Sequence, residues 1–409
     1  MFLIDQPPVP YIDPWCSPVG DRLASLYAGQ QRVAYFYFTP DNSTFRYRIY
    51  NMLECVGRAG PKRSGTYFTL RDFETLYDVL PDIDTLVLCR ARYNARLNEL
   101  INRARGLGIR VLFDIDDLVF DTTYVHLVVD TLDQNNDEDL TWVTWFAEFA
   151  RLGAVLRMCD AAITTNAYLA DRIRSYAEVP VEIIPNFLND AQLELSRRIY
   201  GRKWERHFER DGRIHIGYFS GTPTHNKDFD LASNAIHALM AGDSRIVLRI
   251  VGFLDLRGPL QEFRSRIEFV PLTDFVNLQR LIAEVEINIV PLQDNVFTNC
   301  KSELKYFEAA IVGTVTVASN VFTFRNAIRH GDNGFLARSW NWLEQFKSLI
   351  DALDGDGYEQ IASRAAQHSE ARYASQAYDQ IVKSVLFRSE KETADSADEI
   401  PSQNDKLDR

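Results

Sequence analysis

The segment KSELKYFEAAIVGTVTVAS, residues 301–319, decides the fold of this chain. Three of its apolar residues are spaced so that they share one face of a helix: Leu304, Phe307 and Ile311. Gly313 is placed to end that helix, because a left-handed glycine commonly follows the last helical turn. The β-branched run at 314–318 then predicts a strand that is buried on both faces, as in a parallel sheet.

A second face of the same predicted helix is charged. Three residues at i, i+4 and i+7 share it: Lys301, Lys305 and Glu308. Lysines and helix amides attract a phosphate, whereas a carboxylate accepts hydrogen bonds from neutral hydroxyls. The spacing therefore predicts a site for a sugar phosphate. The solvated face of an ordinary surface helix has the same pattern, so the spacing alone leaves both interpretations open.

The alternation of strand and helix runs twice along the chain. The first series of predicted strands covers 33–38, 66–70, 85–90, 110–116, 161–165 and 182–186. The second series covers 214–219, 246–251, 267–270, 287–292 and 314–318. Two such series predict an α/β protein with two Rossmann-like, doubly wound parallel sheets, which bind ligands at the carboxyl ends of their strands.

These patterns divide the chain into six segments. We expect a lead-in on the surface (1–31), an N-terminal domain (32–187), an interdomain connection (188–210), a C-terminal domain (211–370), a helix that crosses back to the N-terminal domain (371–387) and a tail (388–409). The tail is charged and has almost no large apolar residues, which predicts disorder.

Composition excludes several classes of function. A net charge of −12 over 409 residues argues against broad binding to nucleic acid. The five cysteines are scattered and odd in number, which is typical of reduced thiols and not of a zinc site. No apolar run approaches a membrane span, and the start of the chain lacks the pattern of a secretory signal. We therefore expect a cytoplasmic protein, with association at the inner face of a membrane left open.

The loop after the first strand of the second series, SGTPTHNKD at 220–228, is a candidate phosphate site. Gly221 permits close approach of a ligand to the backbone, and Thr222 and Lys227 can bind phosphate oxygens. His225 can share that role. The P-loop pattern is absent, and a capped turn between a strand and a helix would have the same composition.

Carboxylates end the predicted strand at 110–116. The sequence there is Asp114-Ile115-Asp116-Asp117, and neighbouring like charges raise the pKa of one carboxyl, which can then act as a base. A helix cap with a turn is an alternative interpretation. A metal-binding Asp-x-Asp pair is another, but no second ligand cluster accompanies it.

Arg46 and Arg48 open the first predicted helix. Cations are mildly unfavourable at a helix N-terminus, so an anionic partner is expected nearby. That partner is either Asp41, in a local ion pair, or a phosphate of a donor or acceptor substrate.

Three elements in order resemble the GT-B glycosyltransferases, particularly the large retaining family 4. The donor-site signature of that family is similar to Glu308, Ala309, Gly313, Val317, Ala318 and Ser319. The stretch GDNGFL at 331–336 resembles its Asn-Gly-Phe-Leu element, and IPN at 184–186 resembles the Pro-Asn that closes its N-terminal domain. The resemblance spans roughly residues 33 to 386 and implies the GT-B fold, with two domains facing a cleft.

The resemblance also implies roles for individual residues. Glu308 would bind the ribose of a nucleotide-sugar, and the lysines at 227, 301 and 305 would bind its diphosphate. The other expected donor contacts are Gly221, Thr222, Asn299 and Ser302. Lys301 with Asp116 or Asp117 would carry the chemistry, and Arg46 and Arg48 would lie near the acceptor.

The implied reaction is transfer of a hexosyl-type unit, with retention, from a UDP-, GDP- or dTDP-sugar to a hydroxyl of a glycan or lipid-linked glycan. It needs no cofactor and no obligatory metal, and it implies a role in bacterial surface polysaccharide synthesis such as O-antigen. The chain departs from the family at Cys300, where the first glutamate of a Glu-x7-Glu pair is expected. A thiol cannot replace that carboxylate, so the alternative is a non-catalytic subunit that binds a nucleotide-sugar or glycan within an assembly complex.

Overall fold

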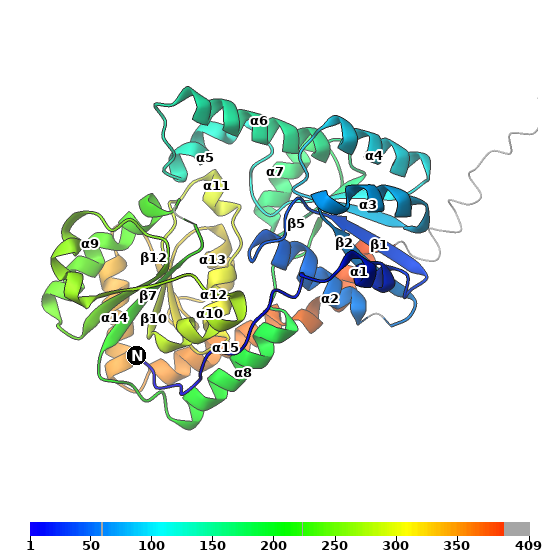
Figure 1. Ribbon diagram of the computed structural model, residues 1–409. Helices are drawn as coiled ribbons and strands as arrows, with labels where there is room; N and C mark the ends of the chain where they lie inside the picture. The colour runs from blue at the N-terminus through cyan, green and yellow to red at the C-terminus, as the bar shows by residue number, and fades with distance from the viewer. Residues whose placement is uncertain (59, 223, 388–409) are drawn as a thin grey trace, which may run out of the picture.

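The computed structural model describes residues 1–58, 60–222 and 224–387, and the predicted tail at 388–409 lies outside the described residues. It contains two six-stranded sheets, and every pair of neighbouring strands is parallel. The sheets belong to two domains, each with helices packed around its sheet (Figure 1). The expected pair of doubly wound parallel sheets is confirmed.

The N-terminal sheet has the strand order β2-β1-β3-β4-β5-β6. Its strands are β1 (Gln31–Phe36), β2 (Arg63–Phe68), β3 (Thr85–Cys89), β4 (Arg110–Asp114), β5 (Ala161–Thr164) and β6 (Val181–Ile183). Its helices are α1 (Val19–Leu26), α2 (Asn51–Gly57), α3 (Phe73–Val79), α4 (Ala95–Gly106), α5 (Val125–Thr131), α6 (Asp139–Leu156) and α7 (Ala167–Ala177). A π-helical turn, η1 (Arg46–Tyr50), precedes α2, and such turns are frequent at functional sites.

The C-terminal sheet has the order β12-β11-β10-β7-β8-β9, which is the Rossmann arrangement. Its strands are β7 (Ile214–Ser220), β8 (Ile246–Gly252), β9 (Ile267–Val270), β10 (Ile287–Val290), β11 (Val315–Ser319) and β12 (Phe335–Ala337). Its helices are α9 (Asn226–Gly242), α10 (Phe275–Glu284), α11 (Val296–Asn299), α12 (Leu304–Ala310), α13 (Phe322–Ala327), α14 (Trp342–Asp354) and α15 (Tyr358–Tyr373). The chain order reverses between β7 and β10, so the ligand crevice is expected outside the ends of these two strands.

Five short 3-10 segments complete the described structure. They are η2 (Leu70–Asp72), η3 (Leu80–Asp82), η4 (Thr122–Tyr124), η5 (Gly258–Arg266) and η6 (Ser375–Tyr378). Gly313 has a φ of +66° directly beyond α12, and a Cβ there would approach the Tyr200 ring to 2.8 Å. A glycine is therefore required between α12 and β11.

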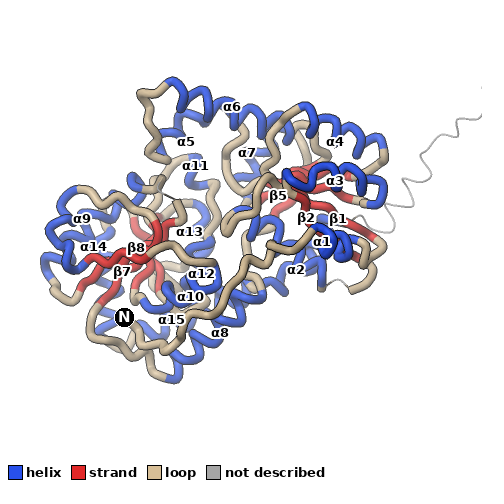
Figure 2. Tube along the Cα trace, viewed as in Figure 1, coloured by secondary structure: helices blue, strands red, loops and turns tan. Residues whose placement is uncertain are grey.

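The connections between the domains are themselves ordered. The segment expected as a connection forms α8 (Asp190–Glu205), which packs against α10, and the last helix, α16 (Asp379–Leu386), packs against α2 of the N-terminal domain. Figure 2 shows the lead-in as a long loop running from one domain to the other. It is more deeply buried than expected, because Phe2 and Trp15 are core residues and the Trp15 ring packs against Phe45 of one domain and Phe275 of the other.

Candidate functional site

Charged residues from both domains meet at the carboxyl ends of the two sheets. Lys301, between α11 and α12, places Nζ 3.4 Å from Asp117 Oδ1, and Asp117 follows β4 of the other domain. Arg90, which follows β3, donates from Nη2 to Asp117 Oδ2 at 2.9 Å and from Nε to Asp116 Oδ1 at 2.6 Å. Thr44 Oγ1 donates to the other Asp116 oxygen at 3.3 Å. The expected catalytic residues are therefore brought together, and the contact between lysine and aspartate joins the domains.

The pKa of Asp117 is not raised, as that of a catalytic base would be. Burial alone would raise the pKa of this carboxyl, but Lys301 and Arg90 outweigh burial and hold the pKa below its usual value. A carboxylate held ionised in this way is a weak base. Asp117 is suited to stabilising a positive charge that develops on a neighbouring sugar. The raised pKa expected for one carboxyl of this cluster is found at Asp114 instead, where burial and the neighbouring charge of Asp116 raise the pKa to about 6 against the opposing effect of Arg48.

Glu308 on α12 is buried and accepts three hydrogen bonds at one oxygen. Oε1 receives Tyr47 Oη at 2.6 Å, Arg46 Nη2 at 3.2 Å and Gln192 Nε2 at 3.3 Å. Among the described residues, none donates to Oε2. One carboxylate of the C-terminal domain thus binds η1 of the N-terminal domain and α8, and its second oxygen is left for a ligand hydroxyl.

Arg46 lies against protein and not against an open acceptor surface. Its guanidinium is 4.1 Å from the centre of the Tyr47 ring and 4.9 Å from that of Phe275, and the residue is 4% exposed. Nε and Nη1 are buried without a hydrogen-bond partner among the described residues. The anionic partner of Arg46 is Glu308, and neither Asp41 nor an acceptor phosphate is needed to explain its position.

Arg48 does not fit the expected acceptor role. It is fully buried and donates from Nε and Nη2 to the two oxygens of Asp114, at 2.8 and 3.1 Å. Nη1 donates to the Ile184 carbonyl and to Asn186 Oδ1. All three nitrogens are bound within the domain, so the prediction that Arg48 binds an acceptor is corrected to a structural role.

Lys305 is a second cation near the crevice. Burial and the positive charge of Lys301 together lower the pKa of its ammonium to about 8, against the opposing effects of Asp228 and Glu308. Lys305 and Lys301 also lower the pKa of His225, after the larger effect of burial, so the loop after β7 faces both lysines. His225 Nδ1 lies 3.1 Å from Asp228 Oδ2. A diphosphate placed here would meet Lys305 of α12 and Lys301 of the turn before it.

The prediction that Lys301, Lys305 and Glu308 share one helical face is wrong for Lys301. α12 begins only at Leu304, after Glu303, and Lys301 lies in the turn before it. The Glu303 carboxylate is buried and accepts from Tyr373 Oη at 2.9 Å, which fixes the turn. Lys305 and Glu308 therefore belong to the helix, whereas Lys301 reaches Asp117 from a turn.

Two other expected donor contacts are engaged with protein. Asn299 donates to Asp294 Oδ1 and to the Asn295 carbonyl, both at 2.8 Å, and accepts from the Phe322 amide at 2.6 Å. These bonds use both of its N–H groups. The prediction that Asn299 binds the nucleotide-sugar is therefore corrected: its side chain fixes the loop after β10. Ser302 Oγ accepts from Asn186 Nδ2 at 3.2 Å.

The loop after β7 is open, as a phosphate site requires. A Cβ built on Gly221 would meet nothing within 4 Å, and Thr222 Oγ1 lies 2.9 Å from Thr224 Oγ1. Lys227 is occupied elsewhere in this conformation, because its Nζ donates to the carbonyl and a carboxylate oxygen of Asp130 in α5 at 3.0 and 2.8 Å. Its contact with a diphosphate stays a prediction that requires this bond to open.

Cys300 has a packing role. It is fully buried and packs, together with Phe297 of α11, in the apolar core of the N-terminal domain. Its carbonyl accepts from Asn166 Nδ2 at 2.8 Å, and burial raises the pKa of its thiol. The position at which the resembled family has a carboxylate is thus an apolar contact between domains.

Sequence reasoning missed several residues of this site. The omitted residues are Thr44, Tyr47, Arg90, Asn166 and Gln192. Arg90 carried a usable signal, because it ends the predicted strand 85–90 next to the acidic strand end. Its φ of +42° is rare for a residue other than glycine, and such strain often accompanies function.

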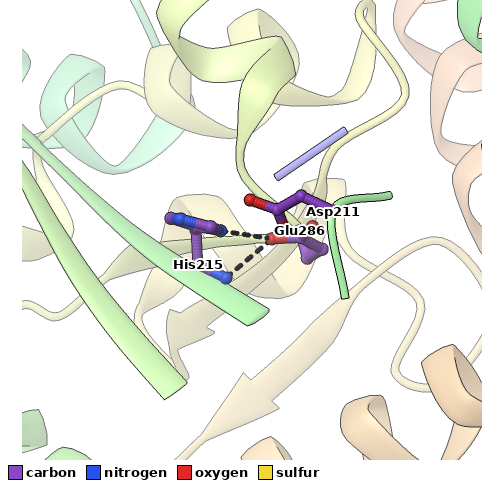
Figure 3. Close-up of side chains that lie close together, drawn as sticks. All are labelled: Asp211, His215 and Glu286. Carbon is purple, nitrogen blue, oxygen red and sulfur yellow. Dashed lines mark hydrogen bonds and ion pairs between the residues drawn. The ribbon is translucent and has the colours of Figure 1, made fainter. Parts of the chain in front are cut away.

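One group of side chains in the described part of the chain could hold a metal ion. Figure 3 shows Asp211, His215 and Glu286 close together, with ligand atoms within 4.8 Å of one another. They lie near the amino ends of β7 and β10, at the edge of the sheet opposite the crevice. The Met1 amino group pairs with Asp211 and with Glu286 Oε1, the latter at 3.2 Å, and offsets part of their negative charge. This group supplies no metal to the crevice.

None of the described helices combines the length and the apolar character needed to cross a bilayer.

Known proteins resemble this chain in sequence over one segment and in fold over most of its length. Residues 213–354, most of the C-terminal domain, match the family described as Glycosyl transferases group 1. No curated protein sequence matches the chain.

Solved structures resemble most of the chain. A sucrose-phosphate synthase from Thermosynechococcus elongatus has 14% identity and a TM-score of 0.56, with 90% of this chain and 100% of that chain covered. HepE from Anabaena, in complex with UDP and glucose, has 12% identity and a TM-score of 0.56 over 87% and 99%. A glycosyltransferase from Rickettsia africae has 11% identity and a TM-score of 0.58 over 88% and 100%. The chain has the GT-B fold, and its residues 213–354 match the family described as Glycosyl transferases group 1.

Proposed function

We propose that this protein is a glycosyltransferase that moves a sugar from a nucleoside-diphosphate sugar to a hydroxyl of a glycan. The observation that carries the proposal is the 3.4 Å contact between Lys301 and Asp117. This contact joins a cation of the C-terminal domain, the expected donor-binding domain, to a carboxylate of the facing N-terminal domain. The match of residues 213–354 to glycosyltransferases group 1 supports the same reaction.

The chemistry follows from where charge develops. The bond between the anomeric carbon and the diphosphate oxygen breaks, and the electron pair leaves with the diphosphate. Lys301 and Lys305 lie where they can stabilise that negative charge, and Asp117 can stabilise the positive charge on the sugar ring. The acceptor hydroxyl oxygen forms the new bond to the anomeric carbon, and its proton passes to the leaving phosphate or to Asp116.

Glu308 is the proposed ribose ligand. Its Oε1 is held by Tyr47, Arg46 and Gln192, so Oε2 is oriented and can accept from a ribose hydroxyl. The oxygen is fixed before the ligand arrives, which lowers the entropy cost of binding. Because the same carboxylate contacts η1, donor binding and closure of the two domains are coupled.

The finer features of the reaction are proposals as well. UDP is the first nucleotide to test, because HepE structures hold UDP and UDP-glucose. Retention, independence of metal, a lipid-linked or polymeric glycan as acceptor and a role in surface polysaccharide synthesis follow from the resemblance to family 4. Acceptors of that kind would bring the protein to the inner face of a membrane as a peripheral partner.

The test begins with thermal unfolding in the presence of UDP, GDP, dTDP or CMP, with and without EDTA. A nucleotide at 100 times its Kd should stabilise the protein by about 2.7 kcal/mol. We expect one nucleoside diphosphate to do so with or without the chelator, and the corresponding sugar nucleotide to be consumed with a glycan acceptor. The Lys301→Met variant should bind the nucleotide and lose transfer, whereas Lys347→Met, on the exposed face of α14, should behave as the wild type.

Three results would contradict the proposal in different ways. Stabilisation by no nucleotide would remove the donor site altogether. Loss of stabilisation in EDTA would contradict independence of metal. Binding without transfer to any acceptor would favour the non-catalytic subunit.

A further inference from the structure

A cavity of about 320 Å³ lies beside the carboxyl ends of β10, β11 and β12, a volume within the range of small-molecule sites. Leu292 after β10 and Leu231 of α9 form its apolar wall. Neither Lys305 nor Glu308 lines it. Because parallel crossovers are right-handed, α9 and α12 cover opposite faces of the sheet, as Figure 1 shows. Ser319, at the end of β11, does line it, so the cavity lies next to the donor region but is separate from the α12 residues that would bind the donor.

Two arginines without a carboxylate partner line this cavity. Arg325 belongs to α13 and Arg338 follows β12, and within the described ranges no carboxylate lies at ion-pair distance from either guanidinium. By contrast, the nearby Arg329 pairs with Asp332 at 2.9 Å. The lining also contains one carboxylate, Asp294, which accepts from Asn299 Nδ2 at 2.8 Å. Both arginines of the cavity are exposed, so their guanidinium groups are available to a ligand. Their planar donors are suited to a carboxylate or a phosphate.

The rest of the lining suits a sugar ring. Trp340 is 75% exposed at the cavity, and the guanidinium carbon of Arg338 lies 5.5 Å from the centre of its ring. An exposed indole bordered by polar groups offers a flat apolar surface to the C–H face of a pyranose. Asn320 Oδ1 is buried there and accepts no hydrogen bond from a described residue. Such an acceptor requires a donor, and a sugar hydroxyl supplies one.

We propose that this cavity is a binding site for one anionic sugar residue. The ring packs on Trp340, its carboxylate or phosphate binds Arg325 and Arg338, and a hydroxyl donates to Asn320. The site is separate from the residues of α12 that would bind the donor in the proposed function. It gives the protein a means to recognise an acidic unit of a longer glycan or a sugar phosphate.

The test is calorimetric titration of the whole protein with four probes: glucuronate, glucose 1-phosphate, glucose and inorganic phosphate. We expect glucuronate or glucose 1-phosphate to bind at least about tenfold more tightly than glucose or phosphate alone, because only these probes satisfy both the arginines and the indole. The probe that binds shows whether the natural ligand is a uronate or a sugar phosphate. Equal affinity for glucose, or for phosphate alone, would overturn the proposal.

Variants locate the binding. Arg325→Gln, Arg338→Gln and Trp340→Ala should each weaken it by about tenfold, whereas Arg329→Gln, a matched change outside the cavity, should not. If the three cavity variants bind as the wild type does, the proposal is wrong. Intrinsic fluorescence should change on binding in the wild type and not in Trp340→Ala.

Two further measurements keep this site apart from the proposed donor site. Saturation with UDP and the Glu308→Gln change should both leave the affinity for the anionic sugar unaltered. Displacement of the sugar by UDP would overturn a separate site. Retained sugar binding in a protein that binds no nucleotide would support this site while the proposed function fails.

Discussion

Lys301 and Asp117 form an ion pair between the two domains, with Nζ 3.4 Å from Oδ1. Each side chain is about one fifth exposed, so the pair is reached by solvent and by a substrate. Asp117 is also held by Arg90, so Lys301 can release it without leaving an unpaired buried charge. The pair is therefore better suited to contacting a substrate than to holding the two domains together.

Replacing Lys301 by Met tests this interpretation. We expect kcat to fall about 10²–10³-fold, because one of the groups that stabilise the leaving diphosphate is lost. The melting temperature should change little, since partly exposed ion pairs contribute about 0–1 kcal/mol. Steady-state kinetics and thermal unfolding measure the two effects. A large loss of stability with unchanged kcat would instead make the lysine a structural residue.

Replacing Glu308 should cost much more stability than replacing Lys301. Glu308→Ala leaves Arg46 buried without a carboxylate, and removing one partner of a buried pair costs about 3–5 kcal/mol. Glu308→Gln keeps the shape of the side chain and should unfold at a higher denaturant concentration than Glu308→Ala. Both variants should lose affinity for the nucleotide. Nucleotide affinity equal to that of the wild type in the Gln variant would remove Glu308 from the donor site.

The sequence predicted the parts of the site that depend on local order. The positions of Lys305 and Glu308 follow from helical spacing after Leu304, and the carboxylates at 116 and 117 follow from their place after a buried strand. Each of these predictions depends on a single helix or strand. The geometry of that element alone positions its residues, so the sequence suffices.

Contacts between distant residues could not be predicted in this way. Arg48 looked like a free cation at a helix start, but its partner Asp114 lies 66 residues away and the pair is fully buried. The turn that separates Lys301 from α12 depends on the bond from Tyr373 to Glu303. No spacing in one segment reveals these partners, because the fold alone brings them together.

The affinity for a nucleoside diphosphate should depend on pH through Lys305. Burial lowers the pKa of this ammonium to about 8, so the free protein loses the charge as the pH rises through 8. A bound diphosphate favours the charged form and raises that pKa. We therefore expect affinity to be constant below pH 8 and to fall above it, by up to about tenfold per pH unit. Titrations between pH 6.5 and pH 9.5 measure this.

Lys305→Arg is the control for the pH effect. Arginine keeps its charge throughout this range, so its affinity profile should be flat. A profile that still falls above pH 8 in this variant would assign the effect to another group.

Arg48→Met tests the structural role assigned to that arginine. The change leaves Asp114 buried and unpaired, which should cost about 3–5 kcal/mol of unfolding free energy. The further change Asp114→Leu should recover much of the loss, because an apolar pair of similar volume replaces a buried ion pair. Denaturant unfolding of the single and double variants measures this, and transfer by the folded double variant should be near that of the wild type. Normal stability with lost transfer in Arg48→Met would restore the acceptor role.

Cys300 offers the sharpest contrast between sequence and structure. The resemblance to family 4 suggests that Cys300→Glu would restore a missing carboxylate and raise activity. The structure predicts the reverse, because the side chain packs with Phe297 in the core of the N-terminal domain, where an unpaired charge is strongly unfavourable. We expect Cys300→Glu to lower the melting temperature and separate α11 from that core, whereas Cys300→Ala should retain transfer at a modest cost in stability. Higher activity in the Glu variant would mean that the resembled donor geometry applies here after all, and that the apolar contact between domains is not needed for catalysis.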